Sequence, residues 1–251
     1  MKKYSLSLVV AAFNEEEILE DFVRKSITDL SRVSDDFEII LVDDGSTDHS
    51  LEIENKLAKE LPQLKIIPLK KNVGTGLNYI PGYKAASKEI VFPNTIDAFF
   101  NTEDLPQMLP FLENADVVSC YRTNLKANNL YQKILTLGNY FLIRILFPLK
   151  LRSYQSVQFH HREFLQGVAI ESRSSFISPE LLIKAAALGK SIKEVPFVFQ
   201  PRRGGKAKGG KMKFVFRALW DILKFWLKWV VLRRPAVIHG DKKYYVRDLR
   251  V

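Results

Sequence analysis

The feature that most constrains the fold is an alternation of strand and helix patterns over the first 120 residues. Apolar runs of strand length recur there, and segments with helical spacing of their apolar residues separate them. The predicted strands lie at 6–12, 38–44, 65–69, 89–93 and 116–121. Strands that alternate with helices in this way form a mostly parallel sheet with helices on both faces. The sequence therefore predicts an α/β fold.

The first four predicted strands end in polar or glycine-rich segments, which read AAFNEEE, VDDGSTD, KNVGTG and NTID. Ligands of such sheets bind beyond the carboxyl ends of the strands, so these segments predict one shared crevice. Asp43 and Asp44 can accept hydrogen bonds from a base or a ribose there, although capping of the next helix would explain either residue alone. The glycines of NVGTG allow the backbone to approach a ligand closely.

These motifs, in this order, resemble the GT-A glycosyltransferases of family 2. ELLIKAAALGKSIKEVPFVF, followed by the spacing of Arg202, Gly205 and Lys208, extends the resemblance from about residue 6 to residue 213. More narrowly, the chain looks like the polyprenyl-phosphate sugar transferases related to dolichol-phosphate mannose synthase. The resemblance implies a GT-A fold and an inverting transfer of a sugar from a nucleotide diphosphate sugar to undecaprenyl or dolichyl phosphate at the cytoplasmic membrane face.

The resemblance also implies roles for individual residues, by motif position. The implied catalytic residues are Asp97, Arg122 and Arg202. The implied substrate-binding residues are Ala12, Phe13, Glu15, Asp43, Asp44, Gly74, Gln155, Ser156 and Lys208. Of these, Ala12, Phe13, Glu15, Asp43 and Asp44 would surround the base and the ribose. The basic residues Arg122, Arg202 and Lys208 would meet phosphates.

Three positions depart from the family pattern. Thr95 stands at the first position of the metal-binding Asp-x-Asp, so Asp97 is the single predicted carboxylate for Mg²⁺ or Mn²⁺. One carboxylate together with a diphosphate can hold Mg²⁺, because this ion takes one or two protein carboxylates and keeps several waters, but its affinity should be lower. Thr75 replaces a basic residue that is common in the glycine motif, and Ser153 replaces an aspartate that is often proposed as a base.

The missing carboxylate at position 153 favours a phosphate acceptor. A sugar hydroxyl needs a base, whereas a phosphate monoester, with a second pKa of about 6, is already an anionic nucleophile at neutral pH. Such an acceptor needs cations to position it. His160 and His161 are candidate acid–base groups, for which a structural role is the preferred interpretation. Two alternatives stay open: a family 2 transferase to a saccharide hydroxyl of another lipid-linked acceptor, and a degenerate, non-catalytic nucleotide-sugar-binding protein.

The segment 214–232 has the pattern of an amphipathic helix. Arg217, Asp221, Lys224 and Lys228 fall on one narrow stripe, and nearly all other side chains are apolar. Near the centre of a membrane each charge would cost about 2.5–3.5 kcal/mol, which outweighs the apolar gain. We therefore predict a membrane-surface helix with its charged stripe towards water and its Trp and Phe side chains among lipids. The alternative is a core helix whose stripe faces solvent. The segment 134–151 is predicted to be a second membrane-facing helix.

A basic, glycine-rich loop precedes the terminal helix. Residues 201–213 carry six cations and no acidic residue, a composition that attracts an anionic membrane surface or a phosphate-bearing substrate. The net charge is +10, but the positive charge gathers beside lipid-like residues and no nucleic-acid motif is present, so nucleic acid is not an expected partner. We predict a transferase domain over 1–200, and a basic loop, interfacial helix and tail over 201–251.

The first residues lead into a strand rather than into a signal-peptide pattern, and the single cysteine, Cys120, excludes an internal disulfide framework. These features favour a peripheral or monotopic protein at the cytoplasmic face of a membrane. The expected partners are a nucleotide-sugar donor, a polyprenyl phosphate acceptor and the membrane surface. Whether the protein forms a homo-oligomer stays open.

Overall fold

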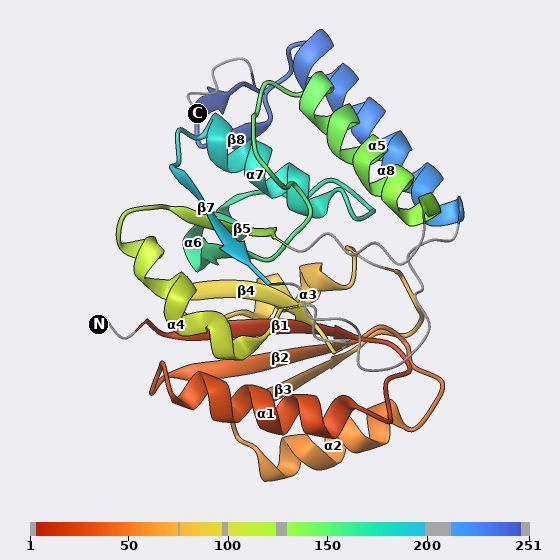
Figure 1. The fold of residues 1–251 in the computed structure, drawn as a ribbon, viewed down its shortest axis with the longest axis vertical. Helices are drawn as coiled ribbons and strands as arrows, with labels where there is room; N and C mark the ends of the chain where they lie inside the picture. The colour runs from red at the N-terminus through yellow and green to blue at the C-terminus, as the bar shows by residue number, and fades with distance from the viewer. Residues whose placement is uncertain (1–3, 75, 97–99, 124–129, 199–211, 247–251) are drawn as a thin grey trace.

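The structure of the chain is a computed structural model that describes residues 4–74, 76–96, 100–123, 130–198 and 212–246 (Figure 1). Five residues singled out above lie outside the described residues, namely Thr75, Asp97, Arg202, Gly205 and Lys208, and so do residues 201–211 of the predicted basic loop. Their roles stay predictions.

A seven-stranded sheet, with strand order β3-β2-β1-β4-β6-β5-β7, forms the centre of the molecule. Its strands are β1 (Leu6–Ala12), β2 (Phe37–Asp43), β3 (Leu64–Pro68), β4 (Ile90–Thr95), β5 (Val117–Arg122), β6 (Gln158–His161) and β7 (Ile192–Phe197). The pairs β1–β2, β1–β4, β2–β3 and β5–β7 are parallel, whereas β6 runs antiparallel to both β4 and β5. The predicted mostly parallel sheet is confirmed, with one reversed strand that the sequence patterns did not indicate.

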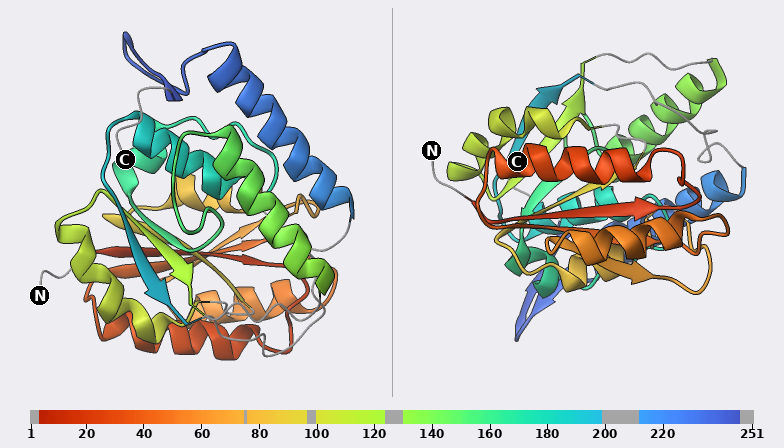
Figure 2. Two further views of the ribbon diagram at one scale, coloured as in Figure 1. Left: turned by 45° about the horizontal axis from the view of Figure 1, so that its top comes forward. Right: turned by 90° about the horizontal axis from the view of Figure 1, so that it is seen from below.

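Helices cover both faces of this sheet (Figures 1 and 2). The α-helices are α1 (Leu19–Ser31), α2 (Ser50–Glu60), α3 (Tyr79–Ala85), α4 (Leu105–Met108), α5 (Leu130–Leu146), α6 (Arg162–Gly167), α7 (Ile177–Ala187) and α8 (Met212–Phe225). The 3₁₀ segments η1 (Thr102–Asp104) and η2 (Leu109–Glu113) flank α4, and the π-helical segment η3 (Trp226–Val231) continues α8. A small hairpin of β8 (Val237–His239) and β9 (Lys242–Tyr244) follows.

Two apolar cores lie on the two sides of the sheet. Side chains alternate between the faces of a strand, so Leu8 of β1 packs in the core beneath α1, α2 and α4. Its neighbour Val9 packs in the other core, with residues of α3, α6 and α7. Ile222, Phe225 and Trp229 of α8 and η3 also belong to this second core. The division of the chain at residue 200 stays a prediction.

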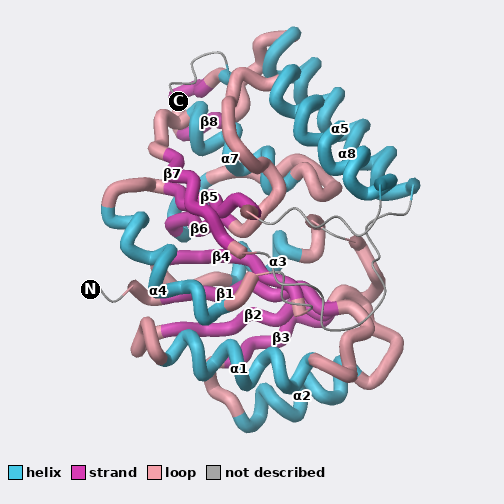
Figure 3. The backbone as a smooth tube through the Cα atoms, in the orientation of Figure 1, coloured by secondary structure: helices cyan, strands magenta, loops and turns pink. Residues whose placement is uncertain are grey.

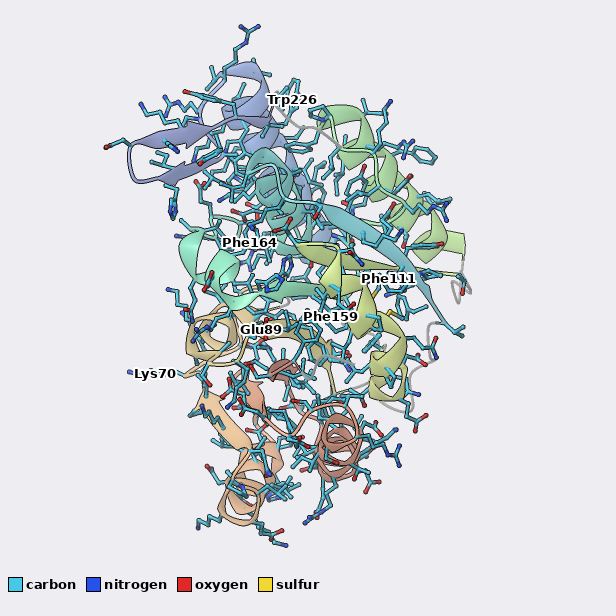
Figure 4. All side chains as sticks on the ribbon, turned by 90° about the vertical axis from the view of Figure 1, so that its left-hand side faces the viewer. Lys70, Glu89, Phe111, Phe159, Phe164 and Trp226 are labelled. Atoms are coloured by element: carbon cyan, nitrogen blue, oxygen red, sulfur yellow. The ribbon has the colours of Figure 1, made fainter. Side chains whose placement is uncertain are left out.

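Aromatic packing holds the reversed strand β6 in place. Phe159 is fully buried, and its ring centroid lies 4.8 Å from that of Phe92 and 5.9 Å from that of Phe100. Figure 4 shows Phe159 in the interior of the molecule, whereas Lys70, just after β3, projects from its edge. The two histidines that end β6 interrupt the apolar run, which explains why no strand was predicted there.

The orientation of α8 differs from the prediction. Asp221 is only 4 % exposed, and Arg217 and Lys228 are half-buried against the rest of the molecule. Lys224 alone of the four charges on the predicted stripe is exposed. The stripe therefore faces the protein, and the prediction that it faces water is wrong. The physical reason is that Arg217 and Asp221 form hydrogen bonds with the domain, as described below, and that Lys228 forms an ion pair with Glu171.

The opposite face of α8 and η3 is apolar and exposed. Trp220 is 70 % exposed, but Trp229 and Phe225 are buried in the core, so the expectation that the Trp and Phe side chains lie among lipids is wrong for these two residues. Helix α5 runs beside α8 and exposes apolar side chains as well (Figures 1 and 2). We call the following exposed side chains the apolar helix pair: Ile134, Leu137, Phe141 and Ile145 on α5, and Phe216, Leu219, Trp220, Leu223, Leu227 and Val231 on α8 and η3. Within the described ranges, no helix combines the length and the apolar character needed to cross a membrane.

Candidate functional site

The carboxyl ends of four strands meet at one edge of the sheet. Strands β1, β2 and β4 are parallel, and β5 shares their direction because both β4 and β5 are antiparallel to β6. Figure 3 shows the strands, in magenta, at the centre of the molecule. Ala12, Asp43, Thr95 and Arg122 are the last residues of these four strands. The structure thus brings these four positions to the edge where ligands of α/β sheets bind.

The loops after β1 and β2 are bonded to each other. Asn14 has a left-handed backbone conformation with φ of 54°, which asparagine tolerates better than most residues. Its backbone N–H donates to Ser46 Oγ at 3.0 Å, and its Oδ1 accepts the N–H of Thr47 at 2.8 Å. The N–H of Glu15 donates to Ser50 Oγ at 2.9 Å. Asn14 was not predicted as a site residue; its place inside FNEEE, directly after a strand, was the available signal.

Asp43 connects the end of β2 to two further segments. Its carboxylate accepts the backbone N–H of Ser46 at 3.2 Å, and its carbonyl oxygen accepts the N–H of Leu69 at 2.8 Å. The next turn needs a glycine, because Gly45 has φ of 72° and a Cβ there would lie 2.6 Å from the carbonyl carbon of Lys71. The chain after β3 is therefore packed directly against the VDDGSTD loop.

Asp44 forms hydrogen bonds with the segment NVGTG at 72–76, which we call the glycine loop. Its carboxylate accepts the backbone N–H groups of Val73 at 2.7 Å and Gly74 at 3.1 Å, and the Nδ2 of Asn78 at 3.3 Å. Burial raises the pKa of the Asp44 carboxyl above its ordinary value, although these hydrogen bonds act in the opposite direction. A carboxylate has about four acceptor sites, so a ligand contact is compatible with these bonds and stays a prediction.

The predicted substrate-binding residues Gln155 and Ser156 lie on the segment before β6. The side chain of Gln155 is exposed, and its Nε2 donates to Ser175 Oγ at 3.3 Å. Ser156 is buried, and its Oγ has no hydrogen-bond partner among the described residues. Arg122 has an exposed side chain at the end of β5. Phe13 and Glu15 are half-buried in the loop after β1.

The two histidines occupy different environments. His160 is buried within the sheet, where β6 pairs with β4 and β5, and burial lowers its pKa to about 3. Its Nε2 lies 3.0 Å from Gln158 Oε1, and its ring stacks on Phe164 at 5.3 Å between centroids. A neutral, enclosed imidazole of this kind supports the structural interpretation of His160. His161 is half-buried at the start of α6.

The donor set for a metal is sparse in the described residues. In the ranges given above, no three His, Cys, Asp or Glu side chains are grouped closely enough to hold a metal ion. The Oγ1 of Thr95, however, is buried at the carboxyl end of β4 and has no hydrogen-bond partner in the described part of the chain. Thr95 lies two positions before Asp97. A hydroxyl and a carboxylate are both oxygen ligands of the kind that Mg²⁺ and Mn²⁺ take, so the residues fit a divalent cation that a diphosphate also ligates.

Sequence comparison then identifies the family. The sequence profile described as "Glycosyl transferase family 2" matches residues 7–172, about two thirds of the chain. The chain belongs to glycosyl transferase family 2. The family expected from the motifs is confirmed.

Two curated relatives within this family illustrate the similarity. The chain is 27 % identical over 233 residues to a dolichol-phosphate mannosyltransferase of Pyrococcus furiosus, an alignment that covers 89 % of this chain and 64 % of the relative. It is 25 % identical over 224 residues to an undecaprenyl-phosphate 4-deoxy-4-formamido-L-arabinose transferase of Pectobacterium carotovorum, with 87 % and 66 % covered. The chain thus spans about two thirds of the length of these relatives.

A solved structure confirms the GT-A fold. Glucosyl-3-phosphoglycerate synthase from Mycobacterium tuberculosis, crystallised with Mn²⁺, uridine diphosphate and phosphoglyceric acid, superimposes with a TM-score of 0.63. The two sequences are 22 % identical, and the match covers 87 % of this chain and 78 % of that one. At this level of identity the likeness concerns the fold alone.

Proposed function

We propose that this chain transfers a sugar, with inversion, from a nucleotide diphosphate sugar to a polyprenyl phosphate at the cytoplasmic face of a membrane. The observation that carries the proposal is that one helix contacts the glycine loop on one side and exposes apolar side chains on the other. Helix α8 contacts the glycine loop through Arg217. The exposed apolar side chains of α8 and η3, which we call the apolar arc, would meet the lipid: Phe216, Leu219, Trp220, Leu223, Leu227 and Val231. The names of the two curated relatives, which act on dolichol phosphate and undecaprenyl phosphate, support the same acceptor class.

The loops after β1 and β2 would bind the nucleotide. Ala12 and Asp43 end the two strands, Phe13 and Glu15 lie on the loop after β1, and these four residues would surround the base and the ribose. The glycine loop, which Asp44 holds, would approach the diphosphate with its backbone. This division leaves Gln155 and Ser156, on the segment before β6, for the acceptor side.

The transfer itself is a displacement at the sugar. An oxygen of the acceptor phosphate forms a bond to the anomeric carbon while the bond from that carbon to the diphosphate breaks, and the nucleoside diphosphate leaves. The acceptor is already anionic at neutral pH, because the second pKa of a phosphate monoester is about 6, so Ser153 need not act as a base. Arg122, Arg202 and Lys208 would position the acceptor and the leaving phosphates.

A divalent cation completes the donor side of the proposal. When bound, Mg²⁺ or Mn²⁺ neutralises negative charge that develops on the leaving diphosphate. Asp97 and Thr95 would hold it. The replacement Asp97→Ala is expected to abolish metal-dependent donor binding and to leave the fold intact, and unchanged donor affinity in the presence of metal would remove Asp97 from the ligand set.

The acceptor assignment is tested with a matched pair of lipids. The purified chain is given vesicles that contain undecaprenyl phosphate or undecaprenol, a panel of nucleotide sugars, and Mg²⁺ or Mn²⁺. We expect a sugar-linked lipid from the phosphate and none from the alcohol, because only the phosphate is anionic without a base. Transfer that requires a saccharide hydroxyl would instead identify the first alternative. Donor binding without turnover on any acceptor would identify the second.

A further inference from the structure

Helix α8 carries one buried acid in its apolar sequence, and this acid has specific partners. The carboxylate of Asp221 accepts the backbone N–H of Arg173 at 2.8 Å and the hydroxyl of Ser174 at 2.8 Å. A buried charge is costly unless hydrogen bonds compensate it, so these two contacts explain why the acid is tolerated there. Asp221 thereby fixes the backbone and the side chain at positions 173 and 174.

The segment that Asp221 holds is packed against the glycine loop. A Cβ built on Gly76 would lie 2.3 Å from the carbonyl oxygen of Ser174, so the two backbones are in direct contact, and Gly76 has φ of 105°. The hydroxyl of Ser174 also accepts the N–H of Phe176 at 3.2 Å, which fixes the turn before α7. A shift of Ser174 would therefore be felt at Gly76.

From Gly76 the contacts continue to Asp44. The N–H of Gly76 donates to Asn78 Oδ1 at 3.1 Å, and Asn78 Nδ2 donates to Asp44 Oδ2 at 3.3 Å. Asp44 in turn accepts the amides of Val73 and Gly74. Both aspartates of this path, Asp44 and Asp221, are buried.

The path then returns to α8. Arg217 Nη1 donates to the carbonyl oxygen of Val73 at 3.4 Å. A Cβ on Gly74 would lie 3.1 Å from the ring of Phe214. Helix α8, the segment at 173–174 and the glycine loop thus form a closed ring of contacts. The same helix exposes the apolar arc on its other side.

We propose that Asp221 is a positioning residue for the glycine loop and that it links this loop to the membrane. When α8 contacts an anionic lipid surface, Asp221 transmits the contact to the glycine loop, which becomes more ordered and binds the nucleotide sugar more strongly. This inference rests on the membrane location in the proposed function. Lipid that holds α8 in its seated position favours the bonded state of Val73, Gly74 and Gly76, which is the state that a diphosphate would meet. Linkage then requires that donor binding strengthens vesicle binding by the same factor.

Amide hydrogen exchange tests the inference without knowledge of the donor. The full chain is measured alone and with vesicles of phosphatidylcholine and phosphatidylglycerol, at the amides of Val73, Gly74 and Gly76. For the native sequence we expect vesicles to slow exchange there by roughly fivefold or more, the lower end of typical coupling between sites. Amides of β1 serve as an internal reference that vesicles leave unchanged.

The variant Asp221→Ala removes the link and retains the apolar arc. We expect it to bind the vesicles, to exchange faster than the native chain at the three loop amides, and to lose the vesicle effect on them. Asp221→Asn keeps an acceptor oxygen and should show an intermediate effect, which guards against failure of the alanine variant to fold. Asp241→Ala, in the exposed turn between β8 and β9, is the matched control and should behave like the native chain.

Donor affinity supplies a readout that a merely structural role would not change. With UDP-glucose and GDP-mannose as probes and Mn²⁺ present, vesicles should increase the affinity for the bound nucleotide sugar in the native chain and in Asp241→Ala, but not in Asp221→Ala. An equal vesicle effect on the loop amides of Asp221→Ala, or faster exchange spread evenly over β1 and the loop, would overturn the positioning role. If the native chain does not bind vesicles, the membrane location and the effect of lipid on the glycine loop are both rejected. The positioning role of Asp221 is retained in that case if Asp221→Ala speeds exchange at the three loop amides, and not in β1, in the absence of vesicles.

Discussion

Helices α1 and α8 are both amphipathic, but they bury opposite faces. In α1 the apolar residues Leu19, Val23 and Leu30 pack in a core, while Arg24 forms exposed ion pairs with Glu20 and with Glu60 of α2. In α8 the charged residues Arg217 and Asp221 face the protein, and much of the apolar surface is exposed. Most charges of α1 are solvated or paired at the surface, which contributes little stability. The exception is Asp29, which is buried and bonded to Lys25 and Thr102. In α8, Arg217 and Asp221 bond to loops of the domain, whereas Lys224 is exposed.

The comparison shows that a helical pattern specifies two faces but does not determine which face is outside. Water satisfies polar side chains on most surface helices, so the polar face is usually exposed. Asp221 is satisfied by the domain instead, because it accepts hydrogen bonds from the backbone amide of Arg173 and from the hydroxyl of the buried Ser174. Because the face with Asp221 is turned towards the protein, the apolar arc is on the outside of the molecule. Large exposed apolar surfaces mark sites that contact a lipid or a partner.

The largest expected effect is on stability, and it compares a tryptophan on the buried face of α8 and η3 with a tryptophan on the exposed face. Trp229→Ala removes a ring that packs on Phe225, with ring centroids 4.6 Å apart, and on Phe147. It should lower the free energy of unfolding by about 3–5 kcal/mol. Trp220→Ala, on the exposed face, should change it by less than about 0.5 kcal/mol. Denaturant unfolding of both variants checks this, and similar losses would mean that the arc around Trp220 is covered in solution.

A buried acid without partners sharpens the contrast with Asp221. Glu54 of α2 is fully buried, and neither carboxylate oxygen has a hydrogen-bond partner among the described residues. Burial raises its pKa to about 8, and the charges of Asp43 and Asp48 add to the shift. The folded protein therefore keeps this proton at neutral pH, whereas the unfolded chain releases it near pH 4.5.

The sign of the resulting pH dependence follows from the raised pKa. Stability from protonated Glu54 is fully present below about pH 4.5 and is lost as the pH rises towards 8, by about 1 kcal/mol for each pH unit. Glu54→Gln mimics the protonated acid and should remove this decline, so the variant gains stability over the native chain as the pH rises from 5 to 8. Thermal unfolding across this range measures it, and parallel curves for the two proteins would show that Glu54 finds a partner.

The sequence predicted the first half of the fold closely because its signals there are local. Strand β2 was expected at 38–44 and lies at Phe37–Asp43, since an apolar run followed by a polar turn determines both ends. Helix α8 with η3 was expected at 214–232 and spans Met212–Val231. Strand β6 was missed because its last two residues, His160 and His161, are polar, and only their position between β4 and β5 makes them part of the sheet.

The site was predictable in its location and less so in its internal bonding. The motifs placed Asp44 at the carboxyl end of β2, where it lies. Its bonds to the amides of Val73 and Gly74, 29 and 30 positions along the chain, join segments that no local pattern connects. The same holds for Asp221, whose partners Arg173 and Ser174 lie 48 and 47 positions away. The orientation of α8 depends on these distant contacts, which explains why its outer face was predicted wrongly.

A change of charge on each side of α8 tests whether the exposed arc meets lipid. Leu223→Glu places a carboxylate on the arc, where it would face apolar tails and anionic headgroups, and should reduce binding to anionic vesicles by about tenfold or more. Lys224→Gln removes one exposed cation and should weaken binding by only about 1 kcal/mol, or fivefold. Vesicle sedimentation measures both. If both variants sediment like the native chain, the arc is covered by protein rather than by lipid.

The smallest expected effect is spectroscopic, and it assigns the lipid contact to one tryptophan. Trp220 is exposed and should shift its fluorescence to the blue when anionic vesicles are added, whereas Trp229 is already buried and should not change. Trp220→Phe keeps an aromatic side chain on the arc, so the variant should still sediment with vesicles while most of the shift disappears. Trp229→Phe is the matched control and should retain the shift. If the shift survives in Trp220→Phe and is lost in Trp229→Phe, lipid changes the environment of the core beneath η3. The buried and exposed faces of α8 and η3 would then not have separate roles, and the contrast with α1 would fail.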